Sequence, residues 1–164
     1  MASGLPDRVE CVRLAEDAAV LERVYLLSEM DRLQDSLADA RGSLRAHFAF
    51  ESLPTGRAGA KVTVQAEPHL VCQRCMQGFA HAVHSESEIE FAPSEAEAPM
   101  DSPREIYVMN DGTVSLRELA EEELLLALPI VAACGTPERC GRAPPAPQER
   151  TRPFAVLQDL LKKT

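Results

Sequence analysis

The chain has few aromatic residues and no long apolar run. Aromatic residues make up 4% of the 164 residues and tryptophan is absent, so aliphatic side chains must build most of the core. No run of about 18 or more uncharged apolar residues occurs, and we therefore expect no membrane-spanning helix. The first eight residues lack a basic start followed by an apolar stretch, so we expect no secretory signal and a location in the reducing cytoplasm.

Motifs of several enzyme classes are also missing. The sequence contains no phosphate-binding glycine loop, no dinucleotide-binding fingerprint, no nucleophile elbow and no internal repeat. What remains is a chain that is 45% hydrophobic, which is too apolar for a wholly disordered protein. Its length is sufficient for one domain with a sizeable core.

The formal net charge is −9, and the charge is unevenly distributed. Residues 86–123 contain 12 acidic and two basic residues, which predicts either a solvated acidic face or a surface that attracts a basic partner. An acidic chain is a poor candidate for wrapping nucleic acid, because contacts to phosphate need lysine and arginine. The balance reverses in residues 139–164, where six basic residues stand against two acidic ones.

The first forty residues are predicted to form a helix, a strand and a second helix. Residues 12–19 suit a short helix, and the β-branched and aromatic residues in 20–27 suit a strand. Met30, Leu33 and Leu37 follow at helical spacing, and Gly42 is expected to end that second helix.

From residue 43 onward the apolar residues alternate with polar ones. The alternation runs through residues 44–50, 61–66 and 79–91, with a glycine-marked turn at 54–60 and a short further strand at 106–109. This is typical of antiparallel strands with one face in water. We therefore predict a single α+β domain over residues 1–140, built on an antiparallel, strongly curved and partly barrel-like sheet with flanking helices.

A helix start is predicted at Ser115. Its hydroxyl can accept a hydrogen bond from the Glu118 amide, while the Glu118 side chain reaches back to the Ser115 amide. Pro129 limits this helix. The neighbouring glutamates at 121–123 could form a catalytic carboxylate group, but on a helix they point about 100° apart and none is paired with a base, so we expect them to be solvated.

Three other segments connect or extend the domain. Residues 92–104 are rich in proline, glutamate, alanine and serine and predict an acidic loop. Residues 141–153 are rich in proline and arginine and predict a linker. Residues 154–164 predict a short amphipathic helix, which either packs as a tail or docks on a partner.

Four of the five cysteines form two pairs. Cys72 and Cys75 have the spacing of two zinc ligands from one turn, and Cys134 and Cys140 form a looser second pair. In a reducing compartment such pairs bind metal more often than they form disulfides. We predict a zinc site made by these four residues, and since four thiolates leave no open position, the ion would be structural.

Other roles for the sulfur atoms stay open. The pairs could be reduced surface thiols, or Cys72 and Cys75 could form a redox couple, although no thioredoxin-like strand–helix pattern surrounds them. Cys11 stands alone among apolar residues and is expected to be buried. Three histidines near the first pair either replace one thiolate or form ordinary hydrogen bonds: His69, His81 and His84.

Several segments together resemble one family. They are Ala60-Lys61-Val62-Thr63-Val64, Leu70-Val71-Cys72-Gln73-Arg74-Cys75, Glu122-Glu123-Leu124-Leu125-Leu126-Ala127-Leu128-Pro129-Ile130 and Arg152-Pro153-Phe154-Ala155-Val156-Leu157. In this order they are similar to the bacterial and plastid large ribosomal RNA subunit accumulation proteins. The resemblance implies a role in the synthesis, processing or stability of large-subunit ribosomal RNA, with no known enzyme activity and no catalytic residues to assign.

Two mechanisms are compatible with that role. In the first, which the composition favours, the acidic surface binds a ribosomal protein or a processing factor for ribosomal RNA. In the second, the basic residues near the carboxyl end contact ribosomal RNA directly: Arg139, Arg142, Arg150, Arg152, Lys162 and Lys163. A thiol-based redox protein remains a third hypothesis.

Overall fold

A computed structural model describes residues 7–109, 111–135 and 140. The chain divides into two units, Met1–Ala133 and Cys134–Thr164, and in the second unit the structure describes Cys134, Gly135 and Cys140. The predicted linker at 141–153, the predicted helix at 154–164 and the six basic residues between 139 and 163 lie outside the described residues.

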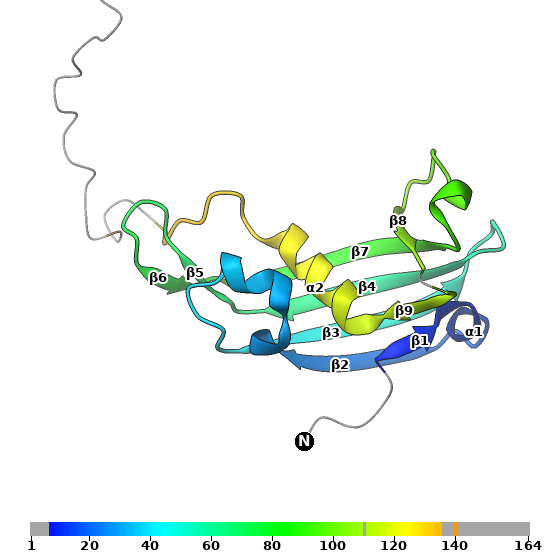
Figure 1. The fold of residues 1–164 in the computed structure, drawn as a ribbon, viewed down its shortest axis with the longest axis horizontal. Coiled ribbons are helices and arrows are strands. Elements are labelled where there is room, and N and C mark those ends of the chain that lie inside the picture. The colour runs from blue at the N-terminus through cyan, green and yellow to red at the C-terminus, as the bar shows by residue number, and fades with distance from the viewer. Residues whose placement is uncertain (1–6, 110, 136–139, 141–164) are drawn as a thin grey trace, which may run out of the picture. The chain divides into compact units, whose positions relative to one another are not determined.

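The first unit is built on a five-stranded sheet (Figure 1). Its strand order is β2-β3-β4-β7-β8, with bounds β2 (Val20–Leu26), β3 (Ser43–Ser52), β4 (Ala58–Ala66), β7 (Val83–Ala92) and β8 (Glu105–Val108). The first four strands pair antiparallel. Their registers follow the predicted alternation, so that Phe48 opposes Val62 on the buried face and His47 opposes Thr63 on the other.

The predicted sheet is wrong in two respects. β8 pairs parallel to β7, so the sheet is mixed rather than antiparallel. A parallel neighbour needs a crossover, and the crossover here is the loop of residues 93–104, which contains the 3₁₀ turn η3 (Glu95–Glu97). The sheet is also open and not strongly curled, because five strands end in two separate edges and do not close into a barrel.

Two small sheets accompany the large one. β1 (Arg8–Glu10) pairs with β9 (Thr113–Ser115), and β5 (His69–Val71) pairs with β6 (Gly78–Ala80), all antiparallel. Figure 1 shows the β5–β6 hairpin at one end of the large sheet and β8 with its crossover loop at the other. The single long run that we expected over 79–91 is therefore two strands, β6 and β7, because residues 81 and 82 interrupt it.

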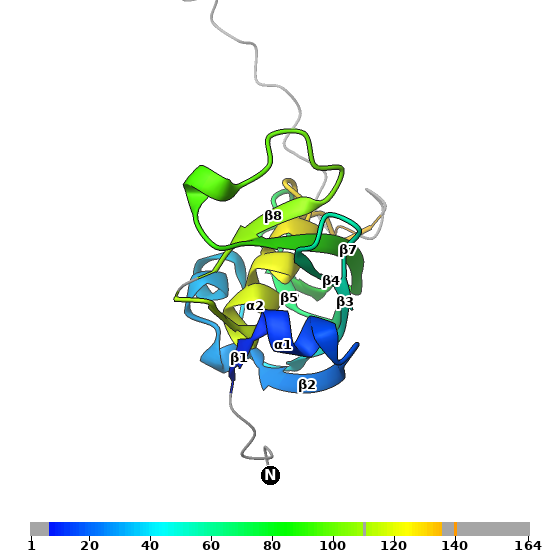
Figure 2. The ribbon, with the colours of Figure 1, turned by 90° about the vertical axis from the view of Figure 1, so that its right-hand side faces the viewer.

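Two α-helices pack on one face of the sheet, α1 (Cys11–Glu16) and α2 (Leu116–Ala127) (Figure 2). The core lies between these helices and the sheet. It contains Phe48, Val62 and Phe91 from the strands and Leu119 and Leu124 from α2, each at most 1% exposed. No helix among the described residues is long and apolar enough to cross a membrane.

The second predicted helix is a pair of 3₁₀ segments instead, η1 (Leu27–Glu29) and η2 (Asp31–Ser36). Met30 between them has an extended backbone, with φ −106° and ψ 95°. Leu27, Met30 and Leu33 are all fully buried. The two short 3₁₀ segments and the extended residue between them together direct these three side chains into the core. Gly42, with φ +106°, leads into β3 rather than ending a helix.

β2 forms one edge of the large sheet. Ala19 and Leu27, which flank this strand, bond through their backbone toward β3, so the backbone groups of the even residues of β2 face outward. The guanidinium of Arg23 donates to the carbonyl of Glu22 at 2.9 Å, from Nη1 to O. Among the described residues no strand pairs with this edge, and Arg23 occupies one of its carbonyls.

Candidate metal centre

The turn between β5 and β6 carries the first cysteine pair. The Cys72 amide donates to the Gln77 carbonyl at 2.9 Å, and the Met76 amide donates to the Cys72 carbonyl at 2.8 Å. Met76 adopts the left-handed conformation, with φ +59°. This tight turn fixes the backbone on both sides of the pair, with Cys72 fully buried and Cys75 half-buried.

The loop after α2 is attached to the same turn. The Gln73 amide donates to the Ala132 carbonyl at 2.9 Å, and Gln73 Nε2 lies 3.5 Å from the Ile130 carbonyl oxygen. Gln73 stands between the two cysteines of the first pair.

The second pair consists of Cys134, which is half-buried, and Cys140, which is 3% exposed. Their Sγ atoms are 3.4 Å apart. The ligand atoms of Cys72, Cys75, Cys134 and Cys140 all lie within 4.8 Å of one another. These are the four residues that the sequence spacing singled out, although 58 positions separate Cys75 from the start of the second pair.

The donor set fits a tetrahedral thiolate centre. Zn–S bonds of about 2.3 Å place the four sulfur atoms of a tetrahedron about 3.8 Å apart. The 4.8 Å limit and the 3.4 Å contact bracket that separation. The contact is also far longer than a disulfide bond of about 2.05 Å. The arrangement is therefore compatible with zinc, and the assignment of the four cysteines as its ligands stays a prediction.

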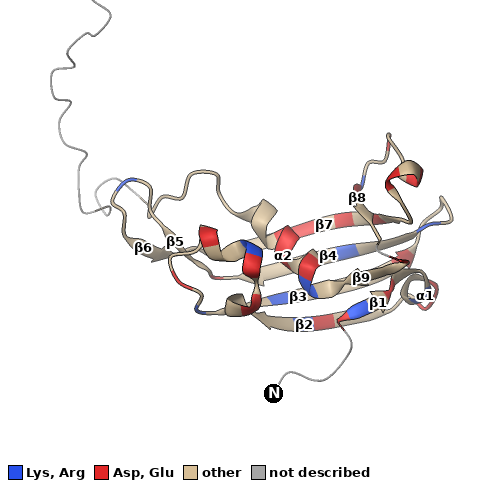
Figure 3. Ribbon diagram, viewed as in Figure 1, with Lys and Arg blue, Asp and Glu red and all other residues tan. Residues whose placement is uncertain are grey.

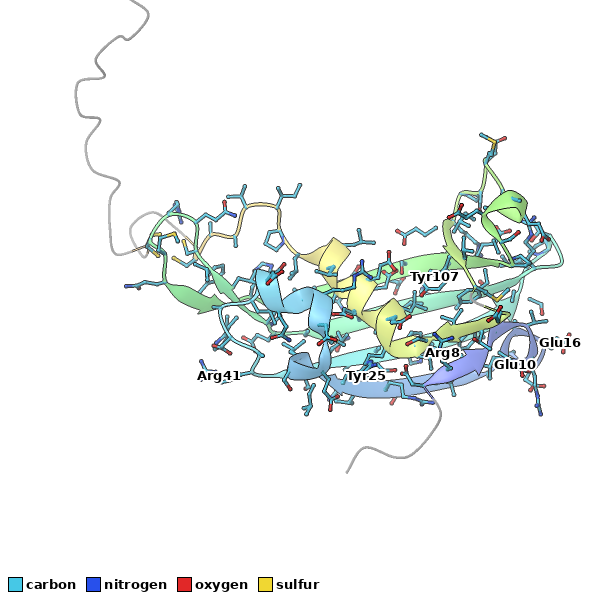
Figure 4. The ribbon with its side chains drawn as sticks, viewed as in Figure 1. Arg8, Glu10, Glu16, Tyr25, Arg41 and Tyr107 are labelled. Carbon is cyan, nitrogen blue, oxygen red and sulfur yellow. The ribbon has the colours of Figure 1, made fainter. Side chains whose placement is uncertain are left out.

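The histidines near the first pair have other neighbours. His69 Nδ1 lies 2.9 Å from Asp39 Oδ2. The same carboxylate accepts from Arg41, whose side chain Figure 4 labels, and this hydrogen bond is the main reason that the pKa of Asp39 lies well below its usual range. His81 stacks edge-on against Phe79 with ring centroids 6.2 Å apart. Within the described residues, the cluster suited to a metal contains cysteines alone.

Cys11 lies away from this cluster and is fully buried, as predicted. Burial raises the pKa of its thiol to about 12. The thiol therefore stays protonated at neutral pH, and it behaves as a small apolar side chain rather than a nucleophile.

The expectation of a solvated face for residues 121–123 is wrong for two of the three. Glu121 is 6% exposed, and its Oε1 accepts from the backbone amides of Arg32 at 2.7 Å and Leu33 at 3.2 Å. These amides belong to the first turn of η2, whose N–H groups have no partner within the helix. Glu121 therefore caps a 3₁₀ helix that lies about ninety residues earlier in the chain.

Glu123 is the second buried carboxylate of α2, at 4% exposure. Ser87 donates to its Oε2 at 2.6 Å. Burial is the main reason that its pKa is raised, and the neighbouring carboxylates of Glu105 and Glu122 act in the same direction. Glu123 and Ser87 together join α2 to β7.

A third buried carboxylate fastens the crossover loop. Glu90 is 3% exposed, accepts from Arg57 Nη1 at 2.9 Å and accepts from Ser102 Oγ at 2.9 Å. The hydrogen bond from Arg57 lowers the pKa of Glu90. The loop before β8 is thus tied to β7 through Ser102.

The predicted cap of α2 is confirmed at Ser115. Its Oγ accepts from the Glu118 amide at 3.2 Å. The same hydroxyl donates to Asp7 at 2.7 Å, and Asp7 also accepts from the Arg117 amide at 3.1 Å and from the hydroxyl of Tyr25, labelled in Figure 4, at 3.0 Å. Sequence analysis missed Asp7, because its partners lie more than 100 residues away or on β2.

The sequence is similar to a described protein family along most of its length. Residues 60–161 match the family model described as "Large ribosomal RNA subunit accumulation protein YceD". Over 172 aligned positions the chain is 27% identical to the Large ribosomal RNA subunit accumulation protein YceD of Haemophilus influenzae, and the alignment covers 97% of each protein. No solved structure matches the chain. Because the family model spans more than half of the sequence, the chain belongs to the YceD family of large ribosomal RNA subunit accumulation proteins.

Proposed function

We propose that this protein is a non-catalytic factor that supports the synthesis, processing or stability of large-subunit ribosomal RNA during ribosome biogenesis. The observation that carries the proposal is family membership, together with similarity to a named relative along nearly its whole length. The name of that relative gives a role in the accumulation of large-subunit ribosomal RNA. From this role we infer that the protein acts in the cytoplasm, where ribosomes assemble.

The charge of the described residues supports action through a protein partner. They contain 23 acidic and 11 basic residues. Figure 3 shows the acidic residues spread over α2, β7 and the segments around them. Such a surface attracts basic proteins and repels phosphate, so we infer that the partner is a ribosomal protein or a basic processing factor.

We further propose that Cys72, Cys75, Cys134 and Cys140 hold a structural zinc ion. When bound, the ion would supply only cross-linking, because four thiolates leave it no open position for catalysis. The separation of the sulfur atoms and the burial of Cys72 and Cys140 support this role. Within the first unit, the hydrogen bond from Gln73 to Ala132 joins the Cys72–Met76 turn to the loop that follows α2.

The test of this function is depletion of the protein from growing cells. We expect the ratio of large-subunit to small-subunit ribosomal RNA to fall, and precursor RNA or its fragments to increase. A tagged copy isolated at moderate salt should recover large-subunit proteins, with RNA recovered only through them. An unchanged RNA ratio, or recovery without any ribosomal component, would contradict the proposal.

A further inference from the structure

A groove of about 470 Å³ borders the cysteine turn, and most of the residues that line it are apolar although its surface also carries polar atoms. Three separate segments of the first unit form it: η2 and the residue after it, the β5–β6 hairpin, and the end of α2 with the loop that follows. Its apolar lining includes Leu37, Leu70, Val71, Met76, Leu128 and Ile130. The groove therefore depends on the hairpin and the loop staying together, which the hydrogen bond from Gln73 to Ala132 enforces.

Large apolar side chains around this groove are unusually exposed. Ile130 is 97% exposed, Met76 is 73% exposed, and the neighbouring Leu126 is 68% exposed. Contiguous exposed apolar surface on a folded protein commonly marks a binding site. The loop that carries Ile130 is held by hydrogen bonds from Gln73, so these side chains are displayed at defined positions.

The backbone conformation of Met76 also supports a binding role for this groove. Its φ of +59° lies in the left-handed region, which glycine and asparagine adopt more easily than a residue with a long side chain. The turn thus carries a large apolar side chain at a position where a glycine would be less strained. This side chain adds to the groove wall and does not enter the core.

Acidic side chains outnumber basic ones in and beside the groove, where the basic residues are Arg74 in the Cys72–Met76 turn and Arg32 in η2. The lining of the groove contains Asp35 and no basic residue. Asp31 lies on the same 3₁₀ segment, η2. Glu122 of α2 forms a partly exposed ion pair with Arg32 of η2, with 3.8 Å between Oε2 and Nη1. A ligand with basic groups beside an apolar face would match this combination, whereas RNA would find no cation in the lining to bind its phosphates.

We propose that this groove binds a basic, amphipathic peptide segment of a protein partner. The inference rests on the proposed function and specifies where the basic partner docks. Apolar side chains of the segment fill the groove between Met76 and Ile130, and its lysines or arginines face Asp35 and the acidic residues of η2 and α2. A second copy of this acidic chain is a poorer occupant, because it would bring like charges together.

Site-specific photocrosslinking in growing cells tests the position of the groove. A benzophenone amino acid replaces Met76 in one full-length variant and Met100 in a matched control. Met100 is 99% exposed and lies in the crossover loop at the other end of the sheet. We expect the Met76 position to cross-link to a positively charged, apolar-faced segment of a large-subunit protein or processing factor, and the Met100 position not to do so. Cross-links to RNA, to a second copy, to the chain itself, or to the same peptides from both positions would overturn the proposal.

Charge substitutions measure the strength of the contact. Met76→Asp and Ile130→Asp change exposed side chains and should leave the melting temperature within a few degrees of the wild type. Each should lower recovery of the cross-linked partner by about tenfold or more, the loss typical of an interface anchor, while Met100→Asp leaves it unchanged. Equal recovery by all three variants would overturn the groove but leave the biogenesis role intact. If the wild-type protein recovers no ribosomal component, the proposed function fails and the groove proposal fails with it.

Discussion

The large sheet and the β5–β6 hairpin belong to the same unit but have different means of support. The sheet buries side chains such as Phe48 and Phe91 completely, and it is joined by long hydrogen-bonded ladders. The hairpin has two strands of three residues each, and its Phe79 and Val71 are partly exposed. A hairpin of this size is marginally stable in water without further support. Apolar burial therefore holds the sheet, whereas the hairpin depends on a few backbone hydrogen bonds and on the zinc site that we propose.

Removal of metal should therefore affect the hairpin most. We expect a strong chelator, or Cys72→Ser, to abolish bound zinc and to lower the local opening free energy by several kcal/mol, since structural zinc sites contribute about 10 kcal/mol or more. Hydrogen exchange should show the amides of Cys72 and Gln73 losing protection, while the amides of β3 and β4 keep most of theirs. Cys11→Ala is the matched control and should retain the metal. Equal loss of protection in the sheet would contradict the separation.

A core substitution should have the opposite effect, lowering the stability of the sheet and leaving the bound metal in place. Phe48→Ala removes a fully buried ring between the sheet and its helices, and we expect the free energy of unfolding to fall by about 3–5 kcal/mol. Zinc content should be unchanged at temperatures where the protein stays folded. Urea unfolding measures the loss, and Val20→Ala, at a side chain 59% exposed on β2, should change stability little.

Loss of the cap on η2 should cost less. Glu121→Ala leaves the amides of Arg32 and Leu33 without their acceptor, and we expect a loss of about 1–3 kcal/mol. Glu122→Ala is the neighbouring control. Its side chain is 43% exposed, and its ion pair with Arg32 is 3.8 Å long, so the change should be near zero. Similar losses in both variants would show that the cap is not the stabilising contact.

The smallest effect is expected from Glu123→Gln, and it depends on pH. The pKa of Glu123 is raised in the folded protein, so ionisation opposes folding. Its destabilising contribution grows as pH rises from the unfolded pKa through the folded pKa, and it vanishes in acid, where both states are protonated. Gln can still accept from Ser87, so the variant should be more stable than the wild type at neutral pH, by less than the loss at Glu121.

The advantage of Glu123→Gln should disappear at low pH. Chemical denaturation at several pH values measures this dependence. A constant difference between the two proteins across pH would contradict the raised pKa of the buried Glu123 carboxyl.

The alternation of apolar and polar residues predicted β3 and β4 well, because a strand with one face in water buries every second side chain. The same alternation could not predict the direction of β8, since the pattern of a four-residue strand is the same whether it pairs parallel or antiparallel. The spacing of Met30, Leu33 and Leu37 predicted a helix, but over so short a stretch it does not distinguish an α-helix from the 3₁₀ segments that form there. Cysteine spacing selected four residues that the structure brings together, whereas nothing local marked Glu121, whose partners are distant in sequence.

The guanidinium of Arg23 should affect how readily this protein self-associates at high concentration. An open sheet edge is a template on which another chain can add a strand, and the apolar outer residues of β2, Val24 among them, would favour such addition. Because Arg23 donates to the Glu22 carbonyl, that carbonyl cannot accept from an added strand, and a positive charge lies beside the edge. Arg23→Ala should increase the light scattering of concentrated solutions on storage. An unchanged scattering signal would show that the edge is protected by other means.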